Sequence, residues 1–223
     1  MALVIKYVNP LYDGPELREL CAAADTAPAS NDEIIKHDNT TTLLKTTIND
    51  RQIIIKRYNT KNWWHCLRRN FQKTRASNCW RMAELFQSVG LSTPHTVAVI
   101  ESRIGPIAGK SWYLSEHHDS ELLLDYLNVP DWHSRFEQVA DLVMQIFNSL
   151  NRHRLSHGDM KATNILVSDD SLMLIDMDAS RRHRFGWTHS RALNRDKARF
   201  LKNWDNLPAL RQCFVERFAV MGM

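Results

Sequence analysis

The sequence predicts an α+β fold in which a β-rich first part is followed by a mostly helical second part. Three observations support this. Short β-branched runs separated by turn residues occupy much of the first half, and apolar residues recur every three or four positions later on. Within the second part stands one polar stretch, "LSHGDMKATNILV" (155–167). A chain of 223 residues is long enough for two small lobes, each with a buried interior.

Short strands are expected to follow one another through the first part. "EIIKH", "TLLKTTI" and "IIIKRY" are the first, and Asn49-Asp50 between the last two favours a hairpin. "TVAVIES" and "SWYLSE" predict two more strands. Residues 1–30 end in "AAADTAPAS" and are expected to form a loosely packed N-terminal extension. The predicted organisation is therefore an extension at 1–30, a β-rich lobe at 31–116 and a helical lobe at 117–223.

Helices are expected at three places. Apolar residues at helical spacing predict a helix from about Thr74 to Val89, with Gly90 in the place of a C-cap glycine. A strongly amphipathic pattern predicts a second helix over 131–151. "NILVS" and "LMLIDMD" then predict a short hairpin, and the last forty or so residues are expected to be helical.

The charge is modest overall but unevenly distributed. The formal net charge is +4, yet residues 56–81 carry eight Lys or Arg and no acid, together with Trp63 and Trp64. A second basic run covers 181–202 and is interrupted only by Asp196. Such segments attract phosphates on lipids, nucleic acids or substrates. The four cysteines have no paired spacing, which favours reduced thiols and a cytoplasmic location.

The polar stretch contains the residue types that phosphoryl transfer requires. Asp159 is the candidate base for an acceptor hydroxyl, and Lys161 is a cation that would reach the transferred phosphate. Asn164 offers an amide oxygen to Mg²⁺, and the predicted hairpin would return Asp176 beside it as a second ligand. Each residue alone has an ordinary structural interpretation, but their joint spacing favours a phosphotransferase.

At this point the chain resembles the protein-kinase-like superfamily. Residues 33–204 resemble, within it, the lipopolysaccharide core kinases that phosphorylate Kdo or heptose. The resemblance rests on "IIIKRYN", "RASNCWRMAELFQSVGLSTP", "WYLSE", "HGDMKATNILV", "LIDMDASRRHR" and "RDKARFLKNW". It implies a two-lobed kinase-like fold that uses ATP and Mg²⁺.

The resemblance also implies roles for residues in the β-rich lobe. Lys56 would bind the ATP phosphates, and the backbone around Glu116 and His117 would meet adenine. A glutamate is expected to pair with Lys56; Glu84 is one candidate, but Cys79 stands where relatives carry the acid. Asp178 would be a further metal ligand or an orienting group.

The sequence departs from protein kinases in two further respects. No glycine lies between Gly14 and Gly90, so "HDNTTT" (37–42) would have to cover the phosphates. Gly158 replaces the arginine that many protein kinases have before the catalytic Asp, and no A-P-E-like segment follows Asp176. The second of these differences argues against a peptide substrate.

Three functional hypotheses follow. The first is phosphorylation of a lipopolysaccharide core glycolipid at the cytoplasmic face of the inner membrane, which the basic segments 56–81 and 181–202 would contact. The second is a small-molecule kinase of the aminoglycoside or choline type, against which Lys161 argues mildly. The third is a catalytically silent kinase-like binding protein or a nucleic-acid-binding module. No recognised nucleic-acid motif accompanies the basic segments, so no specific nucleic acid is expected as a partner.

Overall fold

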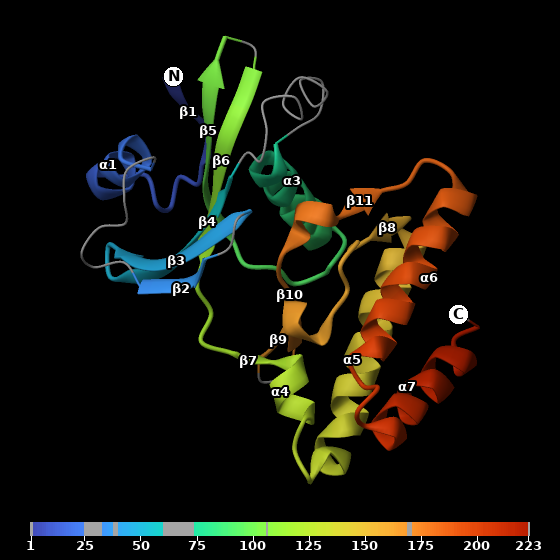
Figure 1. The fold of residues 1–223 in the computed structure, drawn as a ribbon. Coiled ribbons are helices and arrows are strands. Elements are labelled where there is room, and N and C mark those ends of the chain that lie inside the picture. The colour runs from blue at the N-terminus through green and yellow to red at the C-terminus, as the bar shows by residue number, and fades with distance from the viewer. Residues whose placement is uncertain are drawn as a thin grey trace. The chain divides into compact units, whose positions relative to one another are not determined.

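The computed structural model describes residues 2–24, 33–37, 40–59, 74–105, 107–168 and 171–222. The chain divides into two compact units (Figure 1). Unit 1 comprises Met1–Ala83 and Pro94–His118, and unit 2 comprises Glu84–Thr93 and Asp119–Met223. Unit 1 is built mainly of strands and unit 2 mainly of helices, which confirms the predicted α+β class.

A mixed-order antiparallel sheet forms the centre of unit 1. Among the described residues its strands lie in the order β1-β5-β6-β4-β3-β2, and each neighbouring pair is antiparallel. Their bounds are β1 (Ala2–Val8), β2 (Glu33–His37), β3 (Thr41–Ile48), β4 (Arg51–Tyr58), β5 (Thr96–Ile104) and β6 (Ile107–Glu116).

The predicted hairpin at Asn49-Asp50 is confirmed. Ile48 pairs with Arg51, so the turn has two residues, and Asn49 and Asp50 both have positive φ, 49° and 60°. That is the conformation of the tight turns that match the twist of paired strands, and Asn and Asp tolerate it better than other side chains. The turn sets the register that places Lys56 opposite Leu43 on β3, and on its other side β4 pairs with β6, where Tyr113 lies opposite Lys56.

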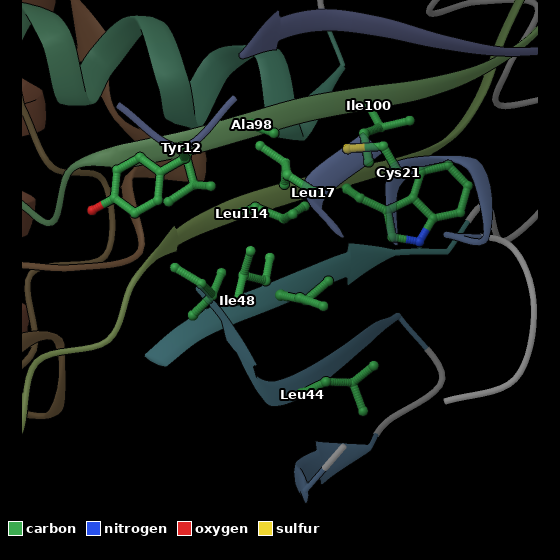
Figure 2. Packing of buried hydrophobic residues seen from close by; sticks show 12 residues of the cluster. Tyr12, Leu17, Cys21, Leu44, Ile48, Ala98, Ile100 and Leu114 are labelled. Carbon is green, nitrogen blue, oxygen red and sulfur yellow. The ribbon is translucent and has the colours of Figure 1, made fainter. Parts of the chain in front are cut away.

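The N-terminal residues are not a loosely packed extension, and that expectation was wrong for 2–24. β1 pairs with β5 along its length, and α1 (Pro15–Ala22) buries Leu17 and Cys21. These side chains and Tyr12 pack against strand residues such as Ile100 and Leu114 (Figure 2). Burial of this apolar surface, worth about 25 cal/mol per Å², stabilises the segment although its strand is short. Burial also raises the pKa of the Cys21 thiol to about 11.

Helices dominate unit 2. α5 (Trp132–Arg152), α6 (Gly186–Lys202) and α7 (Pro208–Val220) pack against one another (Figure 1). Edge-to-face aromatic pairs fill the space between them, because T-shaped contacts match the ring quadrupoles; they involve Phe136, Phe147, Phe200, Phe214 and Phe218. The predicted amphipathic helix at 131–151 and the helical last part are thus confirmed.

Short elements complete unit 2. α4 (Leu123–Leu127) precedes α5, and two small sheets have the orders β10-β9-β7 and β11-β8. Their strands are β7 (Glu121–Leu122), β8 (Leu155–Ser156), β9 (Ile165–Ser168), β10 (Ser171–Leu174) and β11 (Arg181–Arg182). The predicted hairpin of "NILVS" and "LMLI" is confirmed by the antiparallel pairing of β9 with β10.

α3 (Arg75–Ser88) matches the helix predicted over 74–89. Gly90 follows it with a φ of 81°, and Leu91 N–H donates to the carbonyl of Phe86, as expected of a glycine C-cap. In the residues that the structure describes, no helix has the length and apolar character needed to cross a bilayer.

Candidate active site

The polar stretch forms a loop between β8 and β9 in unit 2. It runs through His157, Gly158 and Asp159 into a short 3-10 turn, η1 (Ala162–Asn164). Gly158 has a φ of 83°, and a Cβ there would lie 2.9 Å from the carbonyl carbon of Ala179 and even nearer its oxygen. The position therefore requires glycine, both for backbone conformation and for space. An arginine side chain, usual here in protein kinases, would not fit.

Asp196 on α6 holds the start of this loop. Its carboxylate accepts the backbone N–H of His157 at 2.7 Å and that of Gly158 at 3.0 Å. The residue is only 1% exposed. A buried carboxylate is stable when charge-assisted hydrogen bonds replace water, and these two amides provide them. The acid that seemed to interrupt a basic run is therefore a structural anchor of the loop.

Two cations flank the carboxylate of Asp159. Lys161 Nζ lies 3.0 Å from Oδ2, and Arg199 Nη1 lies 2.9 Å from Oδ1. Arg199 Nη1 also donates to the carbonyl oxygen of Gly158. Arg199 lies three residues after Asp196 on α6, so the two side chains share a helix face and contact the same loop. Asp159 is thus held from both sides while its side chain remains 28% exposed.

Asn164 and Asp176 are brought together by the backbone. The N–H of Ile175 donates to the carbonyl of Asn164 at 3.0 Å, so Asp176 follows directly beside it. The Asn164 side-chain nitrogen donates to the backbone oxygen of Asp159 at 2.9 Å. The amide is therefore oriented by its nitrogen, and its oxygen is the group left for a cation. Asp176 has a φ of 64°, a left-handed conformation that Asp tolerates better than most other side chains.

This pair fits Mg²⁺ better than a transition metal. The described residues contain no group of three or more His, Cys, Asp or Glu that would hold a metal ion by themselves. Mg²⁺ usually takes one or two protein oxygens and completes its shell with water and phosphate oxygens. The oxygens of Asn164 and Asp176 match that pattern.

His157 has a structural role beside the loop. Its Nε2 lies 3.0 Å from the carbonyl oxygen of Ile175, and its Nδ1 has no partner among the described residues. Burial lowers the pKa of His157 below its ordinary value, although the charge of Asp196 opposes this. The Nε2–H of the neutral ring donates a hydrogen bond to the carbonyl oxygen of Ile175, which links the loop to the segment that carries Asp176.

In unit 1, Lys56 is half-buried on β4 and lies near Tyr58, with Nζ 5.4 Å from the ring centroid. The Tyr58 hydroxyl is 3.1 Å from Cys79 Sγ on α3. Cys79 is buried, whereas Glu84 is exposed. The face of α3 that meets the strand of Lys56 therefore carries the cysteine. The pairing of Glu84 with Lys56 stays a prediction.

The segment at the end of β6 also binds its own unit. The N–H of Glu116 donates to His95 O at 3.0 Å, and the N–H of His117 donates to Gln52 O at 2.9 Å. In this conformation these two N–H groups are already satisfied. An adenine ring at this segment would therefore use its other backbone groups.

Two expected features lie partly outside the described residues. Residues 60–73, including Trp63 and Trp64 of the basic segment 56–81, are not described, and neither are residues 38 and 39 of "HDNTTT". Within the described part of that stretch, His37 Nδ1 is 3.0 Å from Thr42 Oγ1.

Comparison with known proteins identifies the family of this chain. The model of the lipopolysaccharide kinase (Kdo/WaaP) family matches residues 29–216, which is most of the chain. The chain belongs to this family. No curated protein sequence matches it. A solved structure described as WaaP in complex with acyl carrier protein matches 98% of this chain and 88% of its own, with a TM-score of 0.60 and 18% identity.

Membership of the lipopolysaccharide kinase family confirms the resemblance that the sequence motifs indicated. The chain is a phosphotransferase with an alcohol group as acceptor, and it belongs to lipopolysaccharide core biosynthesis. The structural match confirms the kinase-like fold. Individual residue roles stay predictions, and the geometry of Asp159 and its neighbours is the basis on which we assign them.

Two residues of the site were missed by sequence reasoning. Asp196 was seen only as an interruption of a basic run, and Arg199 as one of its members. The signal present was their spacing: the two stand three residues apart in a stretch expected to be helical, which places them on one helix face. Their contact with the loop at 157–159, some forty positions earlier, is formed only in the tertiary structure.

Proposed function

We propose that this kinase transfers the γ-phosphoryl group of ATP to a sugar hydroxyl, on heptose or Kdo, of the lipopolysaccharide inner core. The observation that carries the proposal is the Asp159 carboxylate, held between Lys161 and Arg199 on a loop anchored by Asp196. A carboxylate fixed in orientation yet partly open to solvent suits a base for an incoming hydroxyl. Family membership supports the acceptor class.

In this proposal Asp159 receives the acceptor proton. The acceptor oxygen forms a bond to the γ-phosphorus, the bond to the β–γ bridging oxygen breaks, and ADP leaves. Lys161, 3.0 Å from the base, is placed to contact the transferred phosphoryl group. Lys56 binds the ATP phosphates, and the segment around Glu116 and His117 meets adenine.

Asn164 and Asp176 would hold Mg²⁺ through their side-chain oxygens. When bound, the cation would neutralise charge on the phosphate oxygens. Asn164 keeps its amide oriented through the hydrogen bond to the Asp159 backbone, so the metal ligand and the base share one rigid loop.

We further propose that the reaction takes place at the cytoplasmic face of the inner membrane. A glycolipid acceptor is embedded in a bilayer, and the basic segments 56–81 and 181–202 would bring the enzyme to an anionic surface. Only the second of these segments is described throughout.

The test is transfer of labelled phosphate from ATP, with Mg²⁺, to purified core lipopolysaccharide from which phosphate has been removed. Asp159→Asn should abolish incorporation while nucleotide binding, measured by thermal shift, persists. Asp205→Asn, at an exposed ion pair with Arg211, is the matched control and should remain active. Wild-type protein that binds Mg·ATP but labels only water-soluble acceptors would favour a small-molecule kinase instead. Absence of any stabilisation by Mg·ATP would favour a silent binding protein.

The sugar and its hydroxyl would be identified by mass spectrometry. Core oligosaccharide from a strain lacking this protein should be lighter by one phosphate group, and fragmentation would locate the missing group. A core of unchanged mass would contradict the proposed acceptor.

A further inference from the structure

The segment that runs from β11 into the first turns of α6 exposes two large aromatic side chains. We call residues 181–191, "RRHRFGWTHSR", the basic aromatic loop; they comprise β11, the connection and the first six residues of α6. Phe185 is 54% exposed and Trp187 is 70% exposed. Aromatic side chains of this size usually bury most of their surface, because that burial is favourable. Two of them exposed within three positions indicate a surface that meets something apolar.

Four arginines lie near these aromatic residues in the sequence. Arg181, Arg182, Arg184 and Arg191 are all exposed, and the sequence from 179 to 195 contains no Asp or Glu. Throughout the described part of the chain, no ion pair joins any of the four to a carboxylate. Arg184 lies over the Phe185 ring, 5.6 Å from its centroid. The surface therefore combines apolar rings with positive charge that no carboxylate among the described residues neutralises.

Hydrogen bonds fix the backbone of the segment that carries the two exposed rings. The N–H of His183 donates to Arg154 O at 2.8 Å, and Thr188 Oγ1 donates to Phe185 O at 2.8 Å. The N–H of His189 donates to the same Phe185 oxygen at 3.1 Å and starts α6. The loop is thus tied to the segment before β8 at one end and to a helix at the other. Holding the rings out in advance reduces the entropy lost on binding.

The basic aromatic loop lies beside the catalytic loop, because β11 pairs with β8. Arg181 pairs with Ser156 on β8, and the next residue after Ser156 is His157, which leads to Asp159. A surface that binds through the basic aromatic loop would therefore lie only a few residues from the proposed base.

We propose that the basic aromatic loop is a membrane-docking element that binds an anionic lipid bilayer, with Phe185 and Trp187 at the interface and the arginines on lipid phosphates. Aromatic rings with one polar edge favour the bilayer interface, and basic residues beside them add electrostatic attraction. A bilayer is favoured over nucleic acid because no recognised nucleic-acid-binding motif accompanies this segment. The inference rests on the proposed function in that the acceptor is lipid-anchored.

The test is co-sedimentation of the whole protein with vesicles of phosphatidylcholine alone or mixed with phosphatidylglycerol. Wild type should bind the anionic vesicles preferentially, and binding should weaken as salt rises. Replacing both rings, Phe185→Ser with Trp187→Ser, should weaken binding by about ten-fold or more. Replacing Arg181 and Arg182 by Gln should weaken it by about five-fold per arginine.

Matched controls test whether any exposed apolar or basic residue would serve. Val220→Ser removes an apolar side chain that is 87% exposed on α7, and Arg152→Gln removes an exposed arginine at the end of α5; both should bind like wild type. Trp187→Phe should keep binding but lose the part of the fluorescence quenched by brominated lipid. Equal binding of the Ser variant and wild type, or unchanged quenching in Trp187→Phe, would overturn the proposal.

A soluble acceptor separates this inference from the proposed function. With core oligosaccharide released from its lipid, the Phe185/Trp187 variant should turn over at the wild-type rate; with vesicle-embedded acceptor it should be slower. If no core acceptor is phosphorylated by wild type, the proposed function fails, whereas the vesicle binding is judged separately. Salt-sensitive RNA binding through the same arginines, without vesicle selectivity, would overturn the docking proposal.

Discussion

The carboxylate of Asp196 accepts the backbone N–H of His157 at 2.7 Å, across thirty-nine positions of sequence. It also accepts the N–H of Gly158. One buried side chain thus fixes the backbone that presents Asp159. Because the two N–H groups point at this carboxylate, both of its oxygens must be able to accept hydrogen bonds.

Asp196→Asn should therefore impair both stability and catalysis. Asparagine turns one oxygen into a donor that faces an N–H, and the buried mismatch should cost about 1–3 kcal/mol of unfolding free energy. Displacement of the loop should lower the transfer rate by about ten- to hundred-fold. Urea unfolding and labelled-phosphate assays measure the two effects. Asp205→Asn serves as the exposed control, and equal stability of the two variants would contradict the anchoring role.

Arg199→Met should lower kcat by about ten- to hundred-fold with little change in KM for ATP. The reason is that Arg199 orients the Asp159 carboxylate and Gly158 carbonyl but is not assigned to the nucleotide. Arg199→Lys should recover part of the loss, because lysine keeps the charge but not the planar arrangement of donors. Lys202→Met, an exposed change in the last turn of the same helix, should leave kcat unchanged. A pure KM effect would argue for substrate binding instead.

Gly158→Ala should destabilise unit 2 by about 3 kcal/mol or more. The left-handed φ of 83° and the contact with Ala179 both oppose a Cβ. The nearest atoms all belong to Ala179, and none of them is the end of a flexible side chain that could move away. Gly186→Ala is the matched comparison: no atom lies within 4 Å of its Cβ position, and it begins α6. That variant should keep its stability to within about 1 kcal/mol or gain a little. Thermal or urea unfolding distinguishes the two, and similar losses would contradict the steric argument.

Glu101 should support unit 1 at neutral pH and lose its effect in acid. The residue is 2% exposed; burial raises its pKa, but hydrogen bonds from Thr74 and Ser77 and the Arg103 guanidinium outweigh this, so the pKa is lowered. A carboxyl with a lowered folded-state pKa stabilises the protein above its unfolded value, near 4.5, and loses that stabilisation as pH falls through the folded pKa.

Glu101→Gln tests this. At pH 7 the variant should be less stable by about 1–3 kcal/mol, because it loses the charge-assisted bonds from Thr74 and Ser77, which hold the start of α3 to β5, and the bond from Arg103 on the same strand. The difference from wild type should shrink below about pH 4.5. Glu121→Gln, at an exposed position of β7, should show no comparable pH-dependent difference. A constant difference across pH would mean that ionisation of Glu101 is not the cause.

Local patterns determined much of this protein. Asn49-Asp50 specifies its hairpin because few residues accept two successive positive φ values, and the spacing of apolar residues specifies α3 and α5 because a helix repeats every 3.6 residues. The run from Asp159 to Asn164, followed by Asp176, likewise indicated phosphoryl transfer from a local pattern. Its members lie on one loop and one hairpin, so their proximity is nearly a local property.

Only the tertiary structure decided the rest. Residues 2–24 join the core of unit 1 because β5 offers a free edge and an apolar face, which composition does not reveal. Asp196 and Arg199 become parts of the site, and Phe185 and Trp187 become exposed, through the packing of α6 and β11 around β8. A sequence states which charges and rings are present. Which of them are buried, paired or presented to solvent depends on contacts between distant segments, and those exist only in the folded chain.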